Sequence, residues 1–205
     1  GVEVLSADLN GTTWSDELRG RGFDAILACD VLEHLHEPEV TLKALRDLAA
    51  PAARIVISMP NVAYGGLVAG LQLGQFEYAA TGLLDRTHVR FFTRNSLVKT
   101  LMLCGWAPEH WEGYHVPIEQ SEFVWNWKQL SNLQRQALMS GSADFDVYEW
   151  MAVATPMKDA YAARVGAADK EIARLKGELQ ELSLRHDQEH DSLIEHQKAF
   201  SEARA

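Results

Sequence analysis

The sequence has few of the features that mark membrane, metal-thiolate or nucleic-acid-binding proteins. Only two of its 205 residues are cysteines, and their spacing matches no metal-thiolate motif. No apolar run approaches the roughly 20 residues of a membrane-spanning helix, so no membrane span is expected. The net charge of −10 argues against a nucleic-acid-binding protein, which would need a basic face. Cys29 and Cys104 lie in apolar contexts, which predicts buried thiols and a reducing, cytoplasmic location.

Apolar residues make up 47% of the chain and are arranged in short runs. One run, Phe23–Cys29, ends at Asp30, and a second covers residues 54–59. Each run predicts a strand that is buried on both faces of a parallel sheet. Pro38 begins a helix between them, so the three elements form a βαβ unit. The Asp30 side chain is expected to point into the crevice where open α/β sheets bind ligands.

Further elements are predicted on both sides of this unit. Residues 2–7 have the composition of a strand, and so do residues 107–115 and 146–155. A helix capped by Thr93 is expected between the second strand and residue 107. The connection over residues 61–92 is rich in glycine and aromatic residues, and a connection of this length in a compact domain is usually functional.

The composition changes after Pro156, which predicts a globular domain over residues 1–156 and a separate helix over residues 157–205. Apolar residues in this segment alternate at spacings of four and three, as in a coiled coil; they are Tyr161, Val165, Ala168, Ile172, Leu175, Leu179 and Leu182. The register continues, less apolar, through Leu193, His196 and Phe200. A homodimer through residues 161–200 is therefore expected. The alternative is a single amphipathic helix that folds back on the domain.

Four segments together resemble a known protein family. They are VEVLSADL, FDAILACDVLEHL, RIVISMPN and HVRFFTRNSLVKTLMLCGW, and they are similar to segments of class I S-adenosylmethionine-dependent methyltransferases of the ubiquinone-biosynthesis-like branch. The resemblance covers roughly residues 2–115, and FDVYEWMAVATP resembles the closing strand. It implies an α/β, Rossmann-like sheet of order 3-2-1-4-5-7-6 with strand 7 antiparallel. It also implies S-adenosylmethionine as the cofactor and methyl transfer as the reaction.

Two features of that family are missing from the sequence. They are the GxGxG turn after strand 1 and the acid after strand 2. Gly65-Gly66 and Gly20-x-Gly22 are not expected to replace the turn, because neither pair is predicted to follow a buried strand and open a helix. The resemblance thus implies an incomplete sheet with strands 3 to 7, lacking strands 1 and 2, and a C-terminal coiled-coil helix. We expect an N-terminally truncated chain that is inactive by itself.

Five residues match cofactor-binding positions of the family: Asp8 and Leu9 after strand 3, and Asp30, Val31 and His34 after strand 4. The resemblance places Asp8 beside the adenine and Asp30 beside the methionine moiety and the transferred methyl group. There are simpler interpretations of three of these residues. Asp8 could be a turn residue, Asp30 a helix N-cap, and His34 a packed, hydrogen-bonded histidine.

His88, in LLDRTHVRFF, is the candidate general base. A neutral imidazole accepts a proton near pH 7, and Asp85 is expected to orient the ring, so both are candidate catalytic residues. Alternatively, these two residues with Arg86 and Arg90 only hold the connection together.

His34 and His36, with Asp30 nearby, also raise the hypothesis of a metal-dependent hydrolase. Residues two apart on a helix point to different faces, so no metal is expected. Two further function classes stay open. One is a methyltransferase that acts on a small-molecule, glycan or lipid-linked acceptor. The other is a non-catalytic, methyltransferase-like scaffold that oligomerises through its coiled coil.

Overall fold

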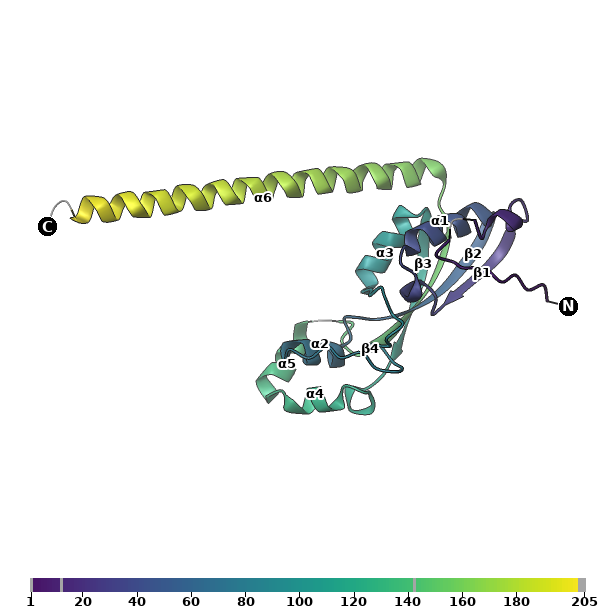
Figure 1. Ribbon diagram of the computed structural model, residues 1–205, viewed down its shortest axis with the longest axis horizontal. Helices are drawn as coiled ribbons and strands as arrows, with labels where there is room; N and C mark the ends of the chain where they lie inside the picture. Colours follow the sequence, from purple (N-terminus) through teal and green to yellow (C-terminus); the bar gives the residue numbers. More distant parts are fainter. Residues whose placement is uncertain (1, 12, 142, 203–205) are drawn as a thin grey trace. The chain divides into compact units, whose positions relative to one another are not determined.

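The structure is a computed structural model that describes residues 2–11, 13–141 and 143–202. The chain divides into two compact units, Gly1–Ala162 and Ala163–Ala205. The first unit contains a mixed sheet and all the shorter helices, and the second contains most of one long helix (Figure 1).

The first unit is built on a four-stranded sheet of order β1-β2-β4-β3 (Figure 1). β1 runs parallel to β2, whereas β4 is antiparallel to both β2 and β3. This is the order and direction expected for strands 4, 5, 7 and 6 of the resembled fold. The strands are β1 (Phe23–Cys29), β2 (Ala49–Pro60), β3 (Trp106–His115) and β4 (Val147–Pro156).

Two helices pack on one face of the sheet, α1 (Pro38–Leu48) and α3 (Arg94–Leu103). Pro38 occupies the first turn of α1, where the missing proline N–H costs nothing. α3 begins at the predicted cap, because Thr93 and Ser96 form a reciprocal capping box. The core under these helices includes the fully buried Trp106, whose Nε1 donates a hydrogen bond of 2.9 Å to the Leu42 carbonyl. The predicted βαβ unit and the α3 start are therefore confirmed.

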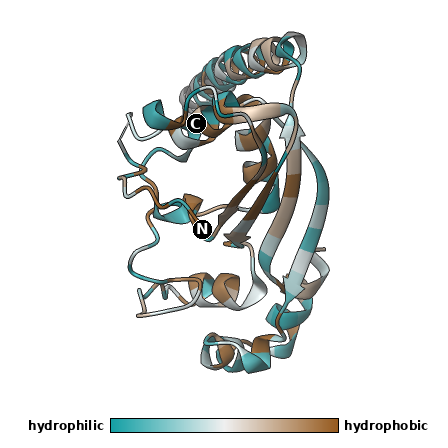
Figure 2. Ribbon diagram, turned by 90° about the vertical axis from the view of Figure 1, so that its right-hand side faces the viewer, coloured by the Kyte–Doolittle hydropathy of each residue, from teal (hydrophilic) through white to brown (hydrophobic). Residues whose placement is uncertain are grey.

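The expectation of burial on both faces is wrong for β1, whereas β2 is buried or half-buried on both faces over residues 55–59. Ile55, Ile57 and Met59 are buried under the helices, but Leu27 on the opposite face is 74% exposed. Cys29, expected to be buried, is also exposed, whereas Cys104 is buried as predicted. The physical reason is that β1 is an edge strand and that α1 and α3 both cover the other face. In Figure 2 the strand at one edge is hydrophilic over most of its length, as the sequence of β3 requires.

Residues 2–7, predicted as a strand, are not among the four described strands. The side chains of Val2 and Val4 are 93% and 87% exposed. A strand is stable only when a neighbour pairs with its backbone N–H and C=O groups. Composition predicts the propensity of a segment for a strand, but it does not show whether a partner is present.

A second core lies among α2 (Gly65–Gln72), α4 (Val124–Gln129) and α5 (Asn132–Gly141) (Figure 1). The expectation that Gly65-Gly66 do not follow a strand and open a helix is wrong, because they begin α2 soon after β2. Both glycines are covered by aromatic rings; a Cβ on Gly65 would lie 2.2 Å from the Phe145 ring. This N-terminus is therefore filled by protein and is not open to a cofactor phosphate or carboxylate.

Three short 3₁₀ helices complete the first unit: η1 (Asp16–Leu18), η2 (Leu32–His34) and η3 (Ile118–Gln120). The C-terminal helix α6 (Asp159–Glu202) has 44 residues. Among its predicted seam residues, Leu193, His196 and Phe200 have side chains outside the described part. None of the helices described in the structure is long and apolar enough to cross a membrane.

Candidate active site

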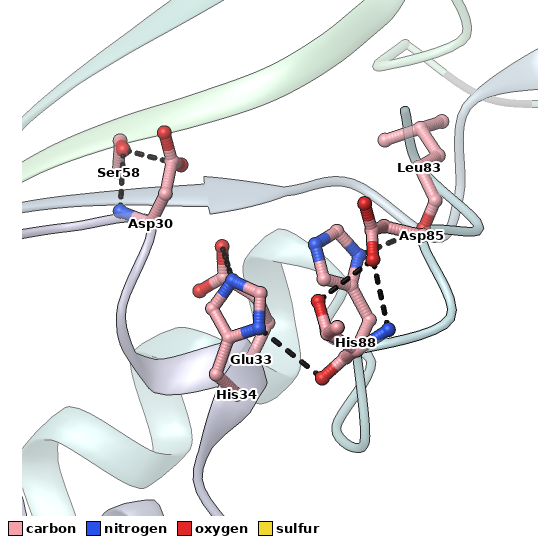
Figure 3. Close-up of polar contacts among 8 residues, drawn as sticks. Asp30, Glu33, His34, Ser58, Leu83, Asp85 and His88 are labelled. Carbon is pink, nitrogen blue, oxygen red and sulfur yellow. Dashed lines mark hydrogen bonds and ion pairs between the residues drawn. The ribbon is translucent and has the colours of Figure 1, made fainter. Parts of the chain in front are cut away.

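The carboxyl ends of β1 and β2 are joined by a polar contact. The backbone N–H of Asp30 donates to Ser58 Oγ at 3.0 Å, and the Ser58 hydroxyl donates to Asp30 Oδ1 at 2.7 Å (Figure 3). Asp30 adopts a positive φ of 52°, which is uncommon for a residue other than glycine. Asp30 is not a helix N-cap, because Val31 precedes η2. The turn directs the chain from β1 straight into η2.

The long connection is attached to η2 by its last residues. The N–H groups of Val89 and Arg90 donate to the Glu33 carbonyl at 2.8 and 3.0 Å, and the Arg90 guanidinium donates to the His36 carbonyl. His34 Nδ1 bonds to the Thr87 carbonyl at 3.1 Å. These bonds place His88 beside residues that are more than 50 positions earlier in the sequence.

Hydrogen bonds fix the neutral tautomer of both imidazole rings at this junction. His34 Nδ1 bonds to the Thr87 carbonyl, and His88 Nδ1 bonds to the Leu83 carbonyl at 3.1 Å (Figure 3). A carbonyl oxygen only accepts, so each Nδ1 must carry the hydrogen. In the neutral rings each Nε2 is therefore an unprotonated acceptor. The rings lie edge to face with centroids 4.9 Å apart.

Glu33 completes the cluster. Its side chain is 1% exposed, and neither carboxylate oxygen has a hydrogen-bond partner among the described residues. The pKa of Glu33 is raised from 4.5 to about 7, chiefly by burial and in smaller part by the nearby Asp30 carboxylate. One ligand atom from each of Glu33, His34 and His88 lies within 4.8 Å of the others. The three side chains present acceptor atoms to one another and supply no donor while the rings and carboxylate are unprotonated.

A third carboxylate lies close to this edge of the sheet. Burial raises the pKa of Glu149, and the Asp30 carboxylate raises it further. Glu149 is paired with Pro60 across the β2–β4 ladder, so it stands where β2 ends. The Asp30 carboxylate thus raises the pKa of both Glu33 and Glu149. Their combined charge favours a cation at this edge of the sheet.

Asp85 does not orient the His88 ring as expected. Its Oδ1 accepts hydrogen bonds from the N–H of Thr87 at 2.8 Å and from the Thr87 hydroxyl at 2.7 Å. These bonds lower the pKa of the exposed Asp85 carboxyl. The His88 ring bonds to the Leu83 carbonyl instead. Asp85 forms a local turn because the aspartate side chain reaches the backbone two residues later more easily than a distant ring.

His36, which was considered with His34 as a possible ligand and set aside, lies apart from the cluster. His36 bonds through its backbone N–H and its ring to Asn10 Oδ1, at 2.8 and 3.3 Å, and takes no part in the cluster. Glu33, which the sequence analysis did not select, contributes the buried carboxylate. The available signal was its position between Leu32 and Leu35, both of which are buried.

The other predicted cofactor residues do not belong to the cluster, but the Val31 carbonyl accepts a hydrogen bond from the His34 backbone N–H at 3.2 Å. Asp8 Oδ1 accepts from the Asn10 N–H at 2.9 Å, and the Leu9 carbonyl accepts from the Thr41 hydroxyl at 3.1 Å. The Leu9 and Val31 side chains pack against the main core. These contacts anchor the segment that precedes β1. The cofactor-binding roles of Asp8, Leu9, Asp30, Val31 and His34 stay predictions.

Residues 6–110 match a family described as a methyltransferase domain. No curated protein matches the chain. Among solved structures, an S-adenosylmethionine-dependent methyltransferase of Archaeoglobus fulgidus is 16% identical, with a TM-score of 0.48, over 74% of this chain and 66% of that one. One of Thermotoga maritima is 12% identical, with a TM-score of 0.48, over 76% and 65%. The 1,6-didemethyltoxoflavin-N1-methyltransferase of Burkholderia thailandensis, solved with S-adenosylhomocysteine, is 15% identical, with a TM-score of 0.37, over 66% and 44%.

The chain thus spans about two thirds of the length of the first two structures. The family match covers more than half of the chain and includes β1, η2, α1, β2 and the residues of the cluster. The chain therefore belongs to the class I S-adenosylmethionine-dependent methyltransferase family.

Proposed function

We propose that the protein transfers the methyl group of S-adenosylmethionine to an oxygen or nitrogen atom of a small-molecule, glycan or lipid-linked acceptor. The observation that carries the proposal is the cluster of Glu33, His34 and His88 at the carboxyl end of β1. This is the edge at which open α/β sheets bind their ligands. The acceptor atoms of the cluster suit an acceptor group that must lose a proton as it is methylated.

The residues of this edge fit the sulfonium half of the cofactor. S-adenosylmethionine supplies the activated methyl group, and its sulfur carries a positive charge. Asp30, Glu33 and Glu149 place carboxylates at the edge of the sheet, where they favour a cation. We assign the methionine and sulfonium contacts to Asp30, Val31 and His34, and the adenine contacts to Asp8 and Leu9.

His88 is assigned as the group that accepts the acceptor's proton. Its ring is only 8% exposed, and the bond from Nδ1 to the Leu83 carbonyl leaves Nε2 as the basic nitrogen. The attachment of residues 87–90 to η2 keeps this nitrogen beside Glu33 and His34. General-base catalysis contributes about 10²- to 10⁴-fold, and most of the remaining acceleration comes from alignment of the reactants.

The test is transfer of radiolabelled methyl groups from S-adenosylmethionine by the full-length protein to panels of phenols, sugars, amines and lipid-linked glycans. Incorporation into one class of acceptor supports the proposal. The absence of incorporation, in a protein that calorimetry shows to bind the cofactor, contradicts it.

Residues 1–205 by themselves are expected to bind S-adenosylmethionine too weakly for calorimetry at about 100 μM cofactor. The sequence contains no GxGxG turn that would hold the cofactor through backbone N–H groups, and the Gly65-Gly66 helix start is covered by Phe145 and Phe123. Micromolar binding to residues 1–205 would contradict this expectation.

A second candidate function is a non-catalytic scaffold that oligomerises through α6. The observation in its favour is the exposure of the seam: Ile172, Leu175, Leu179 and Leu182 are 51%, 49%, 68% and 61% exposed. Val165, Ile172 and Leu179 take the a positions of the heptads, and Ala168, Leu175 and Leu182 take the d positions. Branched residues at a with leucine at d favour a parallel two-stranded coil.

Sedimentation is expected to show a concentration-dependent dimer for residues 1–205 and a monomer for a chain that ends at Pro156. The dimer should be of modest affinity, because about three good heptads lie near the lower limit for independent pairing. Leu175→Asp is the matched point variant, since it charges the seam and leaves the globular unit unchanged. If all three chains are monomers at tens of micromolar, the coiled-coil hypothesis fails.

A further inference from the structure

We propose that Glu33, His34 and His88 form a binding site for one divalent transition-metal ion, such as Zn²⁺. The inference goes beyond the proposed methyl transfer, because binding of the ion alone requires neither cofactor nor acceptor. It rests on the identity of the three side chains, on the hydrogen bonds that fix both rings, and on the unpartnered state of the carboxylate.

The first step is the absence of a donor within the cluster. Both Nδ1 atoms donate to backbone carbonyls, those of Thr87 and Leu83, so both Nε2 atoms of the neutral rings carry free lone pairs. Figure 3 shows the His88 ring turned so that the nitrogen opposite the Leu83 bond faces the side where Glu33 and His34 lie. His34 Nε2 lies 3.9 Å from Glu33 Oε1. Lone pairs that converge in this way repel one another unless a metal cation or a proton lies between them.

The second step is the burial of the carboxylate. Glu33 is 1% exposed, and within the described residues both of its oxygens lack a hydrogen-bond partner. A buried polar group without a partner costs about 1–3 kcal/mol or more, so such groups are usually paired or coordinate a metal. A cation bound to Oε1 or Oε2 and to the two Nε2 atoms satisfies all three groups at once.

The third step is the support around the ligands. Histidines that bind metals donate their other ring N–H to a carbonyl or carboxylate, which fixes the ring orientation. The carbonyls of Thr87 and Leu83 supply this contact. The Glu33 carbonyl holds the N–H groups of Val89 and Arg90, so the backbone on both sides of the site is fixed before an ion binds.

The ligand set selects the class of ion. Two imidazoles and one carboxylate suit Zn²⁺, Mn²⁺ and Fe²⁺, whereas Mg²⁺ and Ca²⁺ prefer oxygen ligands. His34 is 39% exposed, so the site is open to solvent on one side. Three protein ligands with an open position are typical of catalytic rather than structural sites. The open position is suited to an oxygen atom of an acceptor hydroxyl, whose pKa a bound cation lowers.

The test is calorimetric titration of metal-free residues 1–205 with ZnCl₂ at pH 7.5, in a His186→Gln background. His186 and His190 stack on α6 with ring centroids 6.5 Å apart, and this pair could bind zinc independently. One site per chain is expected. Glu33→Gln and His88→Gln should each weaken it by about 100-fold or more, since even loss of a supporting contact costs 10- to 100-fold. His36→Gln, which removes a ring that bonds to Asn10, should leave the affinity unchanged.

A second measurement keeps the test decisive if a variant at one of the buried positions, Glu33 or His88, fails to fold. Co²⁺ gives a visible absorption band when nitrogen ligands bind it. CoCl₂ is therefore titrated into the metal-free parent chain and, separately, into His34→Gln, a variant at a partly exposed position. The band should be present in the parent and lost in the variant, and MgCl₂ should not displace Co²⁺. Equal zinc affinity in the parent, Glu33→Gln and His34→Gln overturns the proposal. The proposal is also overturned if His186→Gln by itself, with the cluster intact, abolishes zinc binding. Neither result bears on methyl transfer, because no cofactor is present.

Discussion

His88→Ala is expected to lower methyl transfer by the full-length protein by about 100-fold or more, with affinity for S-adenosylmethionine within about twofold of the parent. The ring is buried beside Glu33 and His34, and the predicted cofactor contacts come from other residues. Loss of its Nε2 therefore removes a group that acts on the acceptor. The measurement is kcat and KM for the acceptor, with the cofactor dissociation constant determined separately.

Two variants separate this role from a structural one. His88→Asn can keep a side-chain N–H for the Leu83 carbonyl but has no basic nitrogen, so it should fold like the parent and lose the same activity. His110→Ala removes an exposed histidine of β3 and should leave kcat unchanged. If His88→Asn keeps full turnover, or if His88→Ala loses folding and cofactor binding equally, His88 has a structural role.

A chelator distinguishes the two ways in which His88 can act. If the ring works as a free base, a chelator leaves the parent's turnover unchanged. If it binds a cation with Glu33 and His34, a chelator lowers the parent's turnover toward that of His88→Ala, and added Zn²⁺ or Mn²⁺ restores only the parent.

The elements that the sequence predicted well are those whose signals are local. Pro38 and Thr93 mark helix starts through their own backbone chemistry, and the apolar run of Phe23–Cys29 forms a strand. Whether a strand is covered depends on partners that are distant in sequence. Residues 2–7 show strand propensity without a paired neighbour, and Leu27 is exposed because α1 and α3 lie on the other face.

The candidate site was also predictable only in part, because single residues give a local signal and their convergence in the fold does not. His88 could be selected because histidine is suited to proton transfer near pH 7, and His34 because it matches a cofactor-binding position of the resembled family. Their convergence depends on the bonds from residues 87–90 to η2, which no spacing rule encodes. Asp85 was assigned from its proximity in sequence to His88, yet its carboxylate is used by Thr87. Glu33 was missed because its burial follows from the fold.

Glu33→Gln is expected to stabilise the chain at pH 8 in the presence of a chelator. The Glu33 carboxylate ionises with a pKa of about 7 in the folded chain and near 4.5 when unfolded, because burial disfavours the charge. As the pH rises from 4.5 to 7, the unfolded state releases its proton first, so folding stability falls through this range. Above pH 7 the stability contributed by the protonated Glu33 carboxyl is fully lost. A pKa raised by this amount lowers the free energy of unfolding by about 3 kcal/mol once the carboxylate is ionised.

Glutamine has the same shape and no charge, so the variant avoids this penalty. Urea unfolding should give Glu33→Gln a free energy of unfolding about 2–3 kcal/mol above the parent at pH 8, and no clear difference near pH 4.5, where the parent is protonated. Glu112→Gln, at an exposed position of β3, should match the parent at both values. A saturating cation at the proposed site should raise the stability of the parent alone, because a ligand bound only by the folded state stabilises it. A Glu33→Gln variant that is less stable than the parent at pH 8 with chelator would show that the carboxylate has a stabilising partner, and would remove the reason to expect a cation there.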